Sequence, residues 1–242
     1  MLKATVYLLL ALFSIGAFAE KAAVITRAQG EALLQKSHAQ TYGQTVSRGT
    51  ILENNDKVKV NEGFVAMLLL DDQSQFKLHE NTEVRLTLVE DLAGATYHIR
   101  LDYGQTLTDY TPAIGSGFQI HTPTSVVSVK GTKFWTISDP EVGDNVIVLE
   151  GEVDVTNNLT GATSTATAGQ TIRSSVDGVI QSVPTEEGSI PEDPDDSSGG
   201  VGPEQKPAPA PGILSKEPEP GKSNFGMIAF LVVVIGFILM LY

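Results

Sequence analysis

The sequence predicts an all-β body, and two features of its middle region carry that prediction. Apolar and polar residues alternate with a period of two in Thr82–Glu90, Tyr97–Asp102 and Asn145–Val155. Such alternation places one face of a strand in a core and the other in solvent, which is typical of antiparallel sheets. In addition, residues 22–183 contain no twelve-residue span with the apolar stripe of an amphipathic helix.

Single glycines interrupt four of the expected strands, at Gly30, Gly104, Gly151 and Gly169. A lone glycine within a strand pattern indicates a bulge or a bend. Because the intervals between these glycines are unequal, they do not indicate a strict repeat. We therefore expect residues 22–183 to form an elongated antiparallel β-sandwich or roll, solenoid-like, in which the bent strands pass between layers.

Residues 1–19 have the composition of a cleaved signal peptide. Lys3 supplies a basic start, Val6–Gly16 is an apolar run, and Ala17–Ala19 has the small-x-small pattern of a cleavage site. An uncleaved membrane anchor is the alternative, but the run is short for a bilayer core of about 30 Å. The absence of cysteine is compatible with export.

A second apolar segment, residues 225–242, contains no charged residue and is predicted to be a single transmembrane helix. Its length of about 27 Å at 1.5 Å per residue is just sufficient to cross a membrane. A removable sorting tail has a similar layout but usually ends in basic residues. Together with the signal peptide, this helix predicts an extracytoplasmic, periplasmic body that is anchored in the bacterial cell envelope.

Residues 184–221 hold most of the chain's 12 prolines and the acidic run PEDPDD. High charge and few large apolar residues predict a disordered linker that tethers the body to the membrane. Calcium binding by PEDPDD is a weaker alternative, because calcium loops need ligands that converge around a glycine turn.

The segment HTPTSVVSVKGTKFW, residues 121–135, contains the candidate interaction residues: Lys130, Gly131, Thr132, Lys133 and Trp135. The two lysines flank a Gly-Thr pair and could present a small anion-binding turn, although Lys130 could equally be a structural partner of a carboxylate. Trp135, the only tryptophan, shares its parity with Val127 and Val129, so packing in the core is favoured over stacking on a sugar ring.

Catalytic and metal-binding patterns are lacking in the sequence. The 4 histidines have no ligand spacing such as His-x-x-x-His, and no nucleophile elbow, phosphate loop or dinucleotide fingerprint occurs. The net charge of −13 argues against nucleic acid as a partner. We therefore predict a protein that is not an enzyme, with no cofactor and no metal.

An ordered series of motifs resembles the FecR domain, a β-rich extracytoplasmic module of bacterial envelope proteins. In chain order the motifs are AQGEALL, RGT, KVKVNEGFVAMLLL, DDQS, HTPTSVVSVKGTKFW, VLEGEVDV and AGQTI, over about Val24–Ser174. VKGTKF, residues 129–134, is the most specific of them, with Lys130 where the family usually has arginine.

The resemblance implies envelope sensing or signalling through protein–protein interaction. The best-known members of the family carry a cytoplasmic segment that binds a sigma factor, and this sequence has a signal peptide in its place. Two functions therefore remain open: a module that binds another envelope protein, or a carbohydrate or cell-wall binding module or scaffold. An exposed apolar patch would favour the first, and a groove with aromatic faces would favour the second.

Overall fold

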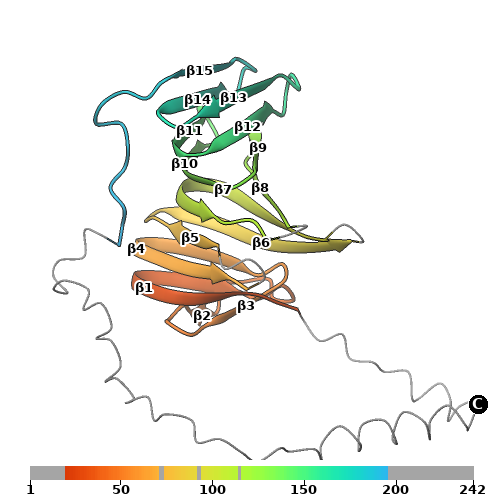
Figure 1. Ribbon diagram of the computed structural model, residues 1–242. Coiled ribbons are helices and arrows are strands. Elements are labelled where there is room, and N and C mark those ends of the chain that lie inside the picture. The colour runs from red at the N-terminus through yellow and green to blue at the C-terminus, as the bar shows by residue number, and fades with distance from the viewer. Residues whose placement is uncertain (1–19, 71–73, 92–93, 114–115, 196–242) are drawn as a thin grey trace, which may run out of the picture. The chain divides into compact units, whose positions relative to one another are not determined.

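The computed structural model describes residues 20–195 except 71–73, 92–93 and 114–115 (Figure 1). Every regular element of this part of the chain is a β-strand, which confirms the all-β prediction. The strands are β1 (Lys21–Gln35), β2 (Gln44–Thr45), β3 (Ile51–Glu53), β4 (Lys57–Leu69), β5 (Gln75–Leu78), β6 (Thr82–Asp91), β7 (Gly94–Tyr110), β8 (Gly117–His121), β9 (Ser125–Val129), β10 (Thr132–Asp139), β11 (Gly143–Glu150), β12 (Glu152–Asn157), β13 (Thr163–Thr167), β14 (Gln170–Ser175) and β15 (Ile180–Pro184).

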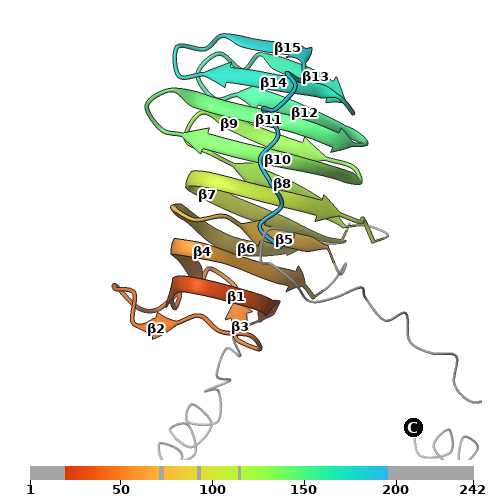
Figure 2. The same ribbon diagram turned by 90° about the vertical axis from the view of Figure 1, so that its left-hand side faces the viewer.

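Hydrogen bonding joins these strands into one 15-stranded sheet that is folded into two layers. The front layer has the order β1-β4-β5-β7-β10-β11-β14-β15, and the back layer has the order β4-β6-β7-β8-β9-β12-β13, since the first half of β4 pairs with β6 and its second half with β5. Strand β7 belongs to both layers, since its first half pairs with β6 and β8 and its second half with β5 and β10. Figure 2 shows the strands stacked one above another from β1 to β15.

The strand pairs are antiparallel, as the alternating patterns predicted, with the exception of β7 and β8. These two strands are parallel, with His98 opposite Gln119 and Arg100 opposite His121. They do not form a hairpin, since β7 ends in the front layer at Tyr110 and β8 begins in the back layer at Gly117.

The main core fills the space between the two layers. Phe76 and Tyr110 of the front layer both contact the ring of Phe118 in the back layer, at centroid distances of 6.2 and 5.1 Å. The hydroxyl of Tyr97 in β7 donates a hydrogen bond of 3.0 Å to the carbonyl of Ala22 in β1. A second, smaller apolar cluster of Leu107, Trp135 and Ile147 is separate from this core.

Glycine permits the close contact between β1 and β4. Gly30 and Gly63 are direct partners in the register, with φ angles of 82° and 78°. A Cβ atom on Gly30 would lie 2.2 Å from the Glu62 carbonyl oxygen, and one on Gly63 would lie 2.1 Å from that of Gln29. Both long strands bend at this point, which lets them cover one end of the core.

The predicted signal peptide (residues 1–19) and transmembrane helix (residues 225–242) lie outside the described residues. Among residues 20–195, as far as the structure describes them, no helix is long and apolar enough to cross a membrane. The predicted linker begins inside the described part: residues 185–195 have defined positions on the front layer, and its remainder from residue 196 onward stays a prediction.

We expect Gly30→Ala to destabilise the body by about 3 kcal/mol, because positive φ and a backbone clash both oppose the new methyl group. Gly49→Ala is the matched control: Gly49 has a φ of 86°, but nothing lies within 4 Å of the position that a Cβ atom would take. Strain alone should cost this control about 1 kcal/mol. Urea unfolding followed by tryptophan fluorescence measures both, and equal losses would contradict the role of the clash.

Candidate interaction surfaces

The turn that holds the predicted interaction residues passes the chain from the back layer to the front layer. Strand β9 pairs with β8 and β12, whereas β10 pairs with β7 and β11. Gly131 has a φ of 102° at this crossing. The Thr132 hydroxyl is buried and donates a hydrogen bond of 2.8 Å to the Glu152 carbonyl. Thr132 therefore fixes the crossing, and Lys130 remains exposed at its tip.

Trp135 is 1% exposed, so its ring offers no free face for a sugar. It does not lie with Val127 and Val129 in the main core, although the three residues have the same parity in the sequence. The crossing at Gly131 resets the alternation, and Trp135 therefore points to the outer face of the front layer. There it packs with Leu107 and Ile147.

The outer cluster is part of a longer line of side chains that crosses the whole front layer. Each residue of the line is the pairing partner of the next, on neighbouring strands. We call this line the front row; it consists of Arg27, Ala66, Lys77, Leu107, Trp135, Ile147, Thr171 and Val183.

Residues 185–195, which we call the strap, run across the front layer from β15 towards β1 (Figure 2). At the start of the strap, the Thr185 N–H donates to the Gly169 carbonyl at 2.9 Å, and Thr185 and Thr171 share a hydroxyl hydrogen bond of 2.9 Å. At its end, Asp195 forms an ion pair of 2.8 Å with Arg27. The strap therefore covers the cluster around Trp135.

Two aspartates of the strap converge on Lys77. The Lys77 ammonium lies 2.7 Å from Asp193 and 3.2 Å from Asp195. Burial acts to raise the pKa of Asp193, but the hydrogen bond from Lys77 and the charges of Lys77 and Lys133 outweigh it, so this pKa lies below its ordinary value. Burial acts to lower the pKa of Lys77, and the two aspartates instead hold it above its ordinary value.

These directions set the pH range in which the strap is paired. The lowered pKa of Asp193 means that its contribution is present above about pH 4, the ordinary aspartate value, and is lost as the pH falls through the lowered pKa. The raised pKa of Lys77 means that its contribution is present below about pH 10 and is lost as the pH rises further.

A second surface is made by three neighbouring turns that expose apolar side chains. We call it the turn cluster: Val142, Leu159, Val176 and Val179, which are 67%, 70%, 45% and 58% exposed. The Val176 N–H donates to the Val142 carbonyl at 3.3 Å, and the Thr160 hydroxyl donates to the Gly178 carbonyl at 3.3 Å. These bonds hold the β10–β11, β12–β13 and β14–β15 turns side by side.

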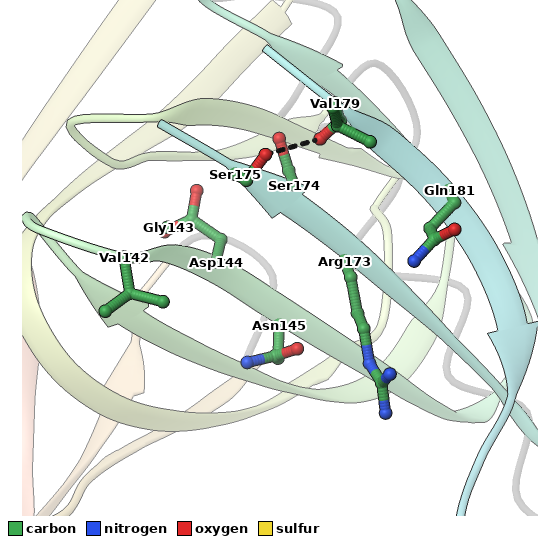
Figure 3. A pocket seen from close by; sticks show the side chains of 9 residues that line it. All are labelled: Val142, Gly143, Asp144, Asn145, Arg173, Ser174, Ser175, Val179 and Gln181. Carbon is green, nitrogen blue, oxygen red and sulfur yellow. Dashed lines mark hydrogen bonds between the residues drawn. The ribbon is translucent and has the colours of Figure 1, made fainter. Parts of the chain in front are cut away.

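A pocket of about 170 Å³ opens beside the turn cluster (Figure 3). Val142 and Val179 lie at its rim, and Arg173 and Gln181 extend along one side. The hydroxyl of Ser175 donates a hydrogen bond of 3.2 Å to the Val179 carbonyl, which fixes the β14–β15 turn.

Asp144, which also lines this pocket, has a buried side chain. Its carboxylate accepts a hydrogen bond of 2.6 Å from the Thr122 hydroxyl, which itself accepts from the Ser125 N–H at 2.7 Å. Burial raises the pKa of Asp144, and the bond from Thr122 only partly offsets this effect. The HTPTS segment, residues 121–125, is thus a folded turn that is tied to β11.

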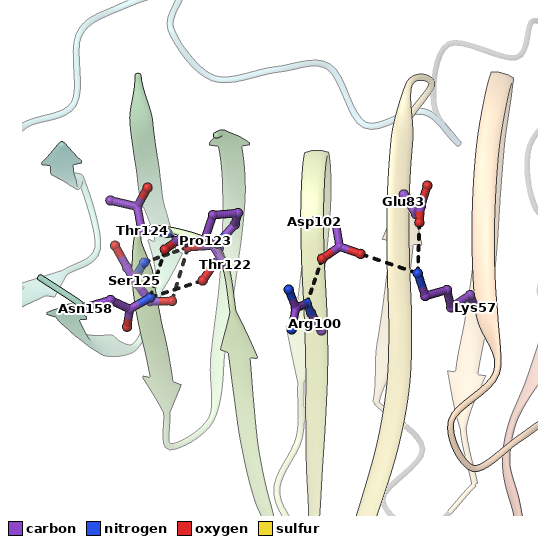
Figure 4. A network of polar contacts seen from close by, with 9 residues as sticks. All are labelled: Lys57, Glu83, Arg100, Asp102, Thr122, Pro123, Thr124, Ser125 and Asn158. Atoms are coloured by element: carbon purple, nitrogen blue, oxygen red, sulfur yellow. Dashed lines mark hydrogen bonds and ion pairs between the residues drawn. The ribbon is translucent and has the colours of Figure 1, made fainter. Parts of the chain in front are cut away.

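Polar contacts on the back layer join separate strands (Figure 4). Lys57 lies 3.3 Å from Glu83 and 3.9 Å from Asp102, which in turn accepts a 2.7 Å contact from Arg100. In the same view, the Asn158 amide donates to the Thr122 carbonyl at 3.2 Å. These contacts connect β4, β6 and β7 and support the sheet; such partly exposed ion pairs are worth about 1 kcal/mol or less each.

The parallel pairing of β7 and β8 brings two histidines together that are far apart in the sequence. Nδ1 of His98 lies 3.0 Å from Nε2 of His121, and the rings are stacked at 5.1 Å. Burial, together with the charges of His98 and Arg100, lowers the pKa of His121. No group of three or more metal-ligating side chains occurs among the residues that the structure describes.

The protein is a two-layer β module. Its features are two bent layers, the connection at Gly131 between them and an ordered series of motifs. Residues 56–154 match the family model described as FecR protein, and this match confirms the resemblance predicted from the motifs. This part of the chain is therefore similar to the FecR family. The matched residues run from the end of the β3–β4 connection into β12 and include the crossing at Gly131 and Trp135.

Two crystal structures of a protein described as a "putative anti-sigma factor" from Parabacteroides distasonis ATCC 8503, at 2.50 and 1.65 Å resolution, are similar to this chain. Each has a TM-score of 0.44 and 19% sequence identity, and the similarity covers 53% of this chain and 59% of that chain. The chain thus matches less than two thirds of that protein's length. No curated protein matches the chain.

We expect Lys130→Ala to change the free energy of unfolding by no more than about 0.5 kcal/mol, as for other surface substitutions. Thr132→Val should cost about 1 kcal/mol, because it removes the hydrogen bond to Glu152. Thermal melting of both variants measures the difference. A larger loss for Lys130→Ala than for Thr132→Val would show that the lysine, and not the threonine, holds the crossing.

We expect Asp144→Asn to gain stability relative to the unmodified protein as the pH rises above about 4. The raised pKa of Asp144 means that the protonated form favours folding and that this contribution is lost as the pH rises through the raised pKa. Asparagine stays neutral and avoids the loss.

Melting curves of both proteins between about pH 3.5 and about pH 7.5 measure this change, since that range begins near the ordinary aspartate pKa and extends well above it. Glu141→Gln, an exposed residue in the neighbouring turn, is the control with the same change in charge. A deficit of Asp144→Asn that grows as the pH rises would show instead that the fold needs the ionised carboxylate.

Proposed function

We propose that this protein is an extracytoplasmic FecR-domain module, anchored in the bacterial envelope, that binds another envelope protein in sensing or signalling. The FecR domain supports the signalling role, because FecR proteins are regulatory. The sequence of residues 1–19 and 225–242 supports export and anchoring, in the periplasm and by a single helix.

The observation that favours a protein partner is the turn cluster. Four aliphatic side chains, each at least 45% exposed, stand on turns that hydrogen bonds hold together. Exposed apolar residues that adjoin one another mark interaction surfaces more often than isolated ones do. The turns are fixed before binding, so a partner would meet an ordered surface and little ordering entropy would be lost.

The alternative, a carbohydrate or cell-wall binding module, has less support. Sugar-binding grooves present flat aromatic faces, whereas none of the large hydrophobic side chains that are exposed in the described part of the chain is aromatic. Trp135, the residue that the sequence offered for this role, is only 1% exposed.

Site-specific photo-crosslinking in the native envelope tests this function. A photo-reactive amino acid at Val142 or at Leu159 of the full-length protein should capture one specific envelope protein, identified by mass spectrometry. The same amino acid at Ile51, which is 41% exposed on β3, is the control and should not capture it. Leu159→Asp, combined with the crosslinker at Val142, should reduce the yield at least about fivefold, because a charge would be desolvated in the interface.

Equal capture from Ile51 and from the turn cluster would contradict a specific surface. If only wall or glycan fragments are joined to the protein, the carbohydrate-binding alternative replaces this proposal.

A further inference from the structure

The front row has the chemistry of a peptide-binding surface. Its centre is apolar, with Leu107, Trp135 and Ile147 on the neighbouring strands β7, β10 and β11. Its β1 end is basic, with Lys77 and Arg27 in the row, and Lys133 adjoins Lys77 in the depression that holds Asp193. An apolar centre beside a basic end suits an extended segment that carries apolar residues first and carboxylates after them.

The strap has this pattern and the required length. Six strand steps separate Thr171 from Arg27 in the front row, about 29 Å at roughly 4.8 Å per step. The ten residue steps from Thr185 to Asp195 span about 33 Å at full extension. The strap is shorter than this limit, because the Ser189 N–H donates to the Glu186 carbonyl at 3.1 Å and forms a turn near its start. Ile190 and Pro191 precede the two aspartates in the sequence, and Ile190 is 46% exposed in this structure. Pro194 is buried between Asp193 and Asp195, whose spacing of two lets both carboxylates reach Lys77.

Side chains at the surface hold the strap beyond its first residue. Glu186 pairs with Arg173, Asp193 with Lys77, and Asp195 with Lys77 and Arg27. The backbone bond from Thr185 to Gly169 lies at its start, where β15 ends. Partly exposed ion pairs contribute little individually and weaken with salt, so this segment can leave without breaking the hydrogen bonds of the sheet.

We propose that the front row is a binding site for an extended acidic peptide of a partner protein, in which an apolar residue and proline precede two aspartates spaced by one residue. In this chain the strap occupies the site. Because the strap is attached next to the site, its effective concentration is high, and a free peptide competes poorly until the strap is weakened. This surface is separate from the turn cluster, and the inference goes beyond the proposed function.

A labelled peptide with the sequence of residues 185–195, TEEGSIPEDPD, tests the proposal on the full-length protein. We expect Asp193→Asn/Asp195→Asn to bind the peptide at least about tenfold more tightly than the unmodified protein, in fluorescence anisotropy, because the competing strap is weakened. The fluorescence of Trp135, the only tryptophan, shows whether the site is covered. Its emission maximum should move to longer wavelength in the double variant and return to its original position when the peptide binds.

Two controls are built into the chain. Glu187→Gln/Glu192→Gln removes the same number of charges from other positions of the strap and should leave both peptide binding and emission unchanged. Lys77→Ala, added to the aspartate variant, should weaken peptide binding at least about tenfold, because the peptide's carboxylates lose their partner, whereas Lys130→Ala should not.

Equal binding by the unmodified protein and by both double variants, or no binding by any of them, would overturn the proposal. If light scattering instead shows that the aspartate variant changes its oligomeric state, the row serves exchange between copies of this chain, and the proposal of a foreign peptide fails. Circular dichroism of each variant excludes unfolding as the cause of a loss.

Discussion

The hydrogen-bond register of the front layer determines what its outer face can do. Each of the eight strands of the front layer places one residue directly opposite a residue of its neighbour, so eight side chains from distant parts of the sequence form one line. A shift of one residue between any two strands would turn the next side chain of the line into the core. The glycine pair at positions 30 and 63 keeps β1 and β4 close enough for this register.

The period-two alternation was sufficient to predict strands, an all-β body and bends at glycines. Gly30, Gly104, Gly151 and Gly169 all have positive φ where the chain bends or turns. Alternation failed where the chain changes layers: Trp135 continues the parity of Val127 in the sequence but faces the opposite side of the fold. Parity is a property of one strand, and the positive φ of Gly131 ends that strand.

The candidate surfaces could not be predicted from the sequence, because each depends on contacts between segments that are far apart. His98 and His121 meet through a parallel pair that no local pattern encodes. The acidic, proline-rich composition of residues 184–195 indicated disorder, since such a segment buries little apolar surface of its own. Its partners are supplied by Lys77 and Arg27, which precede it by more than a hundred residues.

The strap places Asp195, the last described residue, beside β1, the first strand of the body, since Asp195 pairs with Arg27 of β1. Its mechanical consequence is that a pulling force on the residues after Asp195 is first borne by these ion pairs and only afterwards by β15. Side-chain pairs loaded one after another separate at low force, whereas the hydrogen bonds of a sheet resist together. Detachment of the strap from the front layer would release about 33 Å of chain at roughly 3.3 Å per residue. Under a pulling force the chain would therefore lengthen by detachment of the strap before the folded layers are strained.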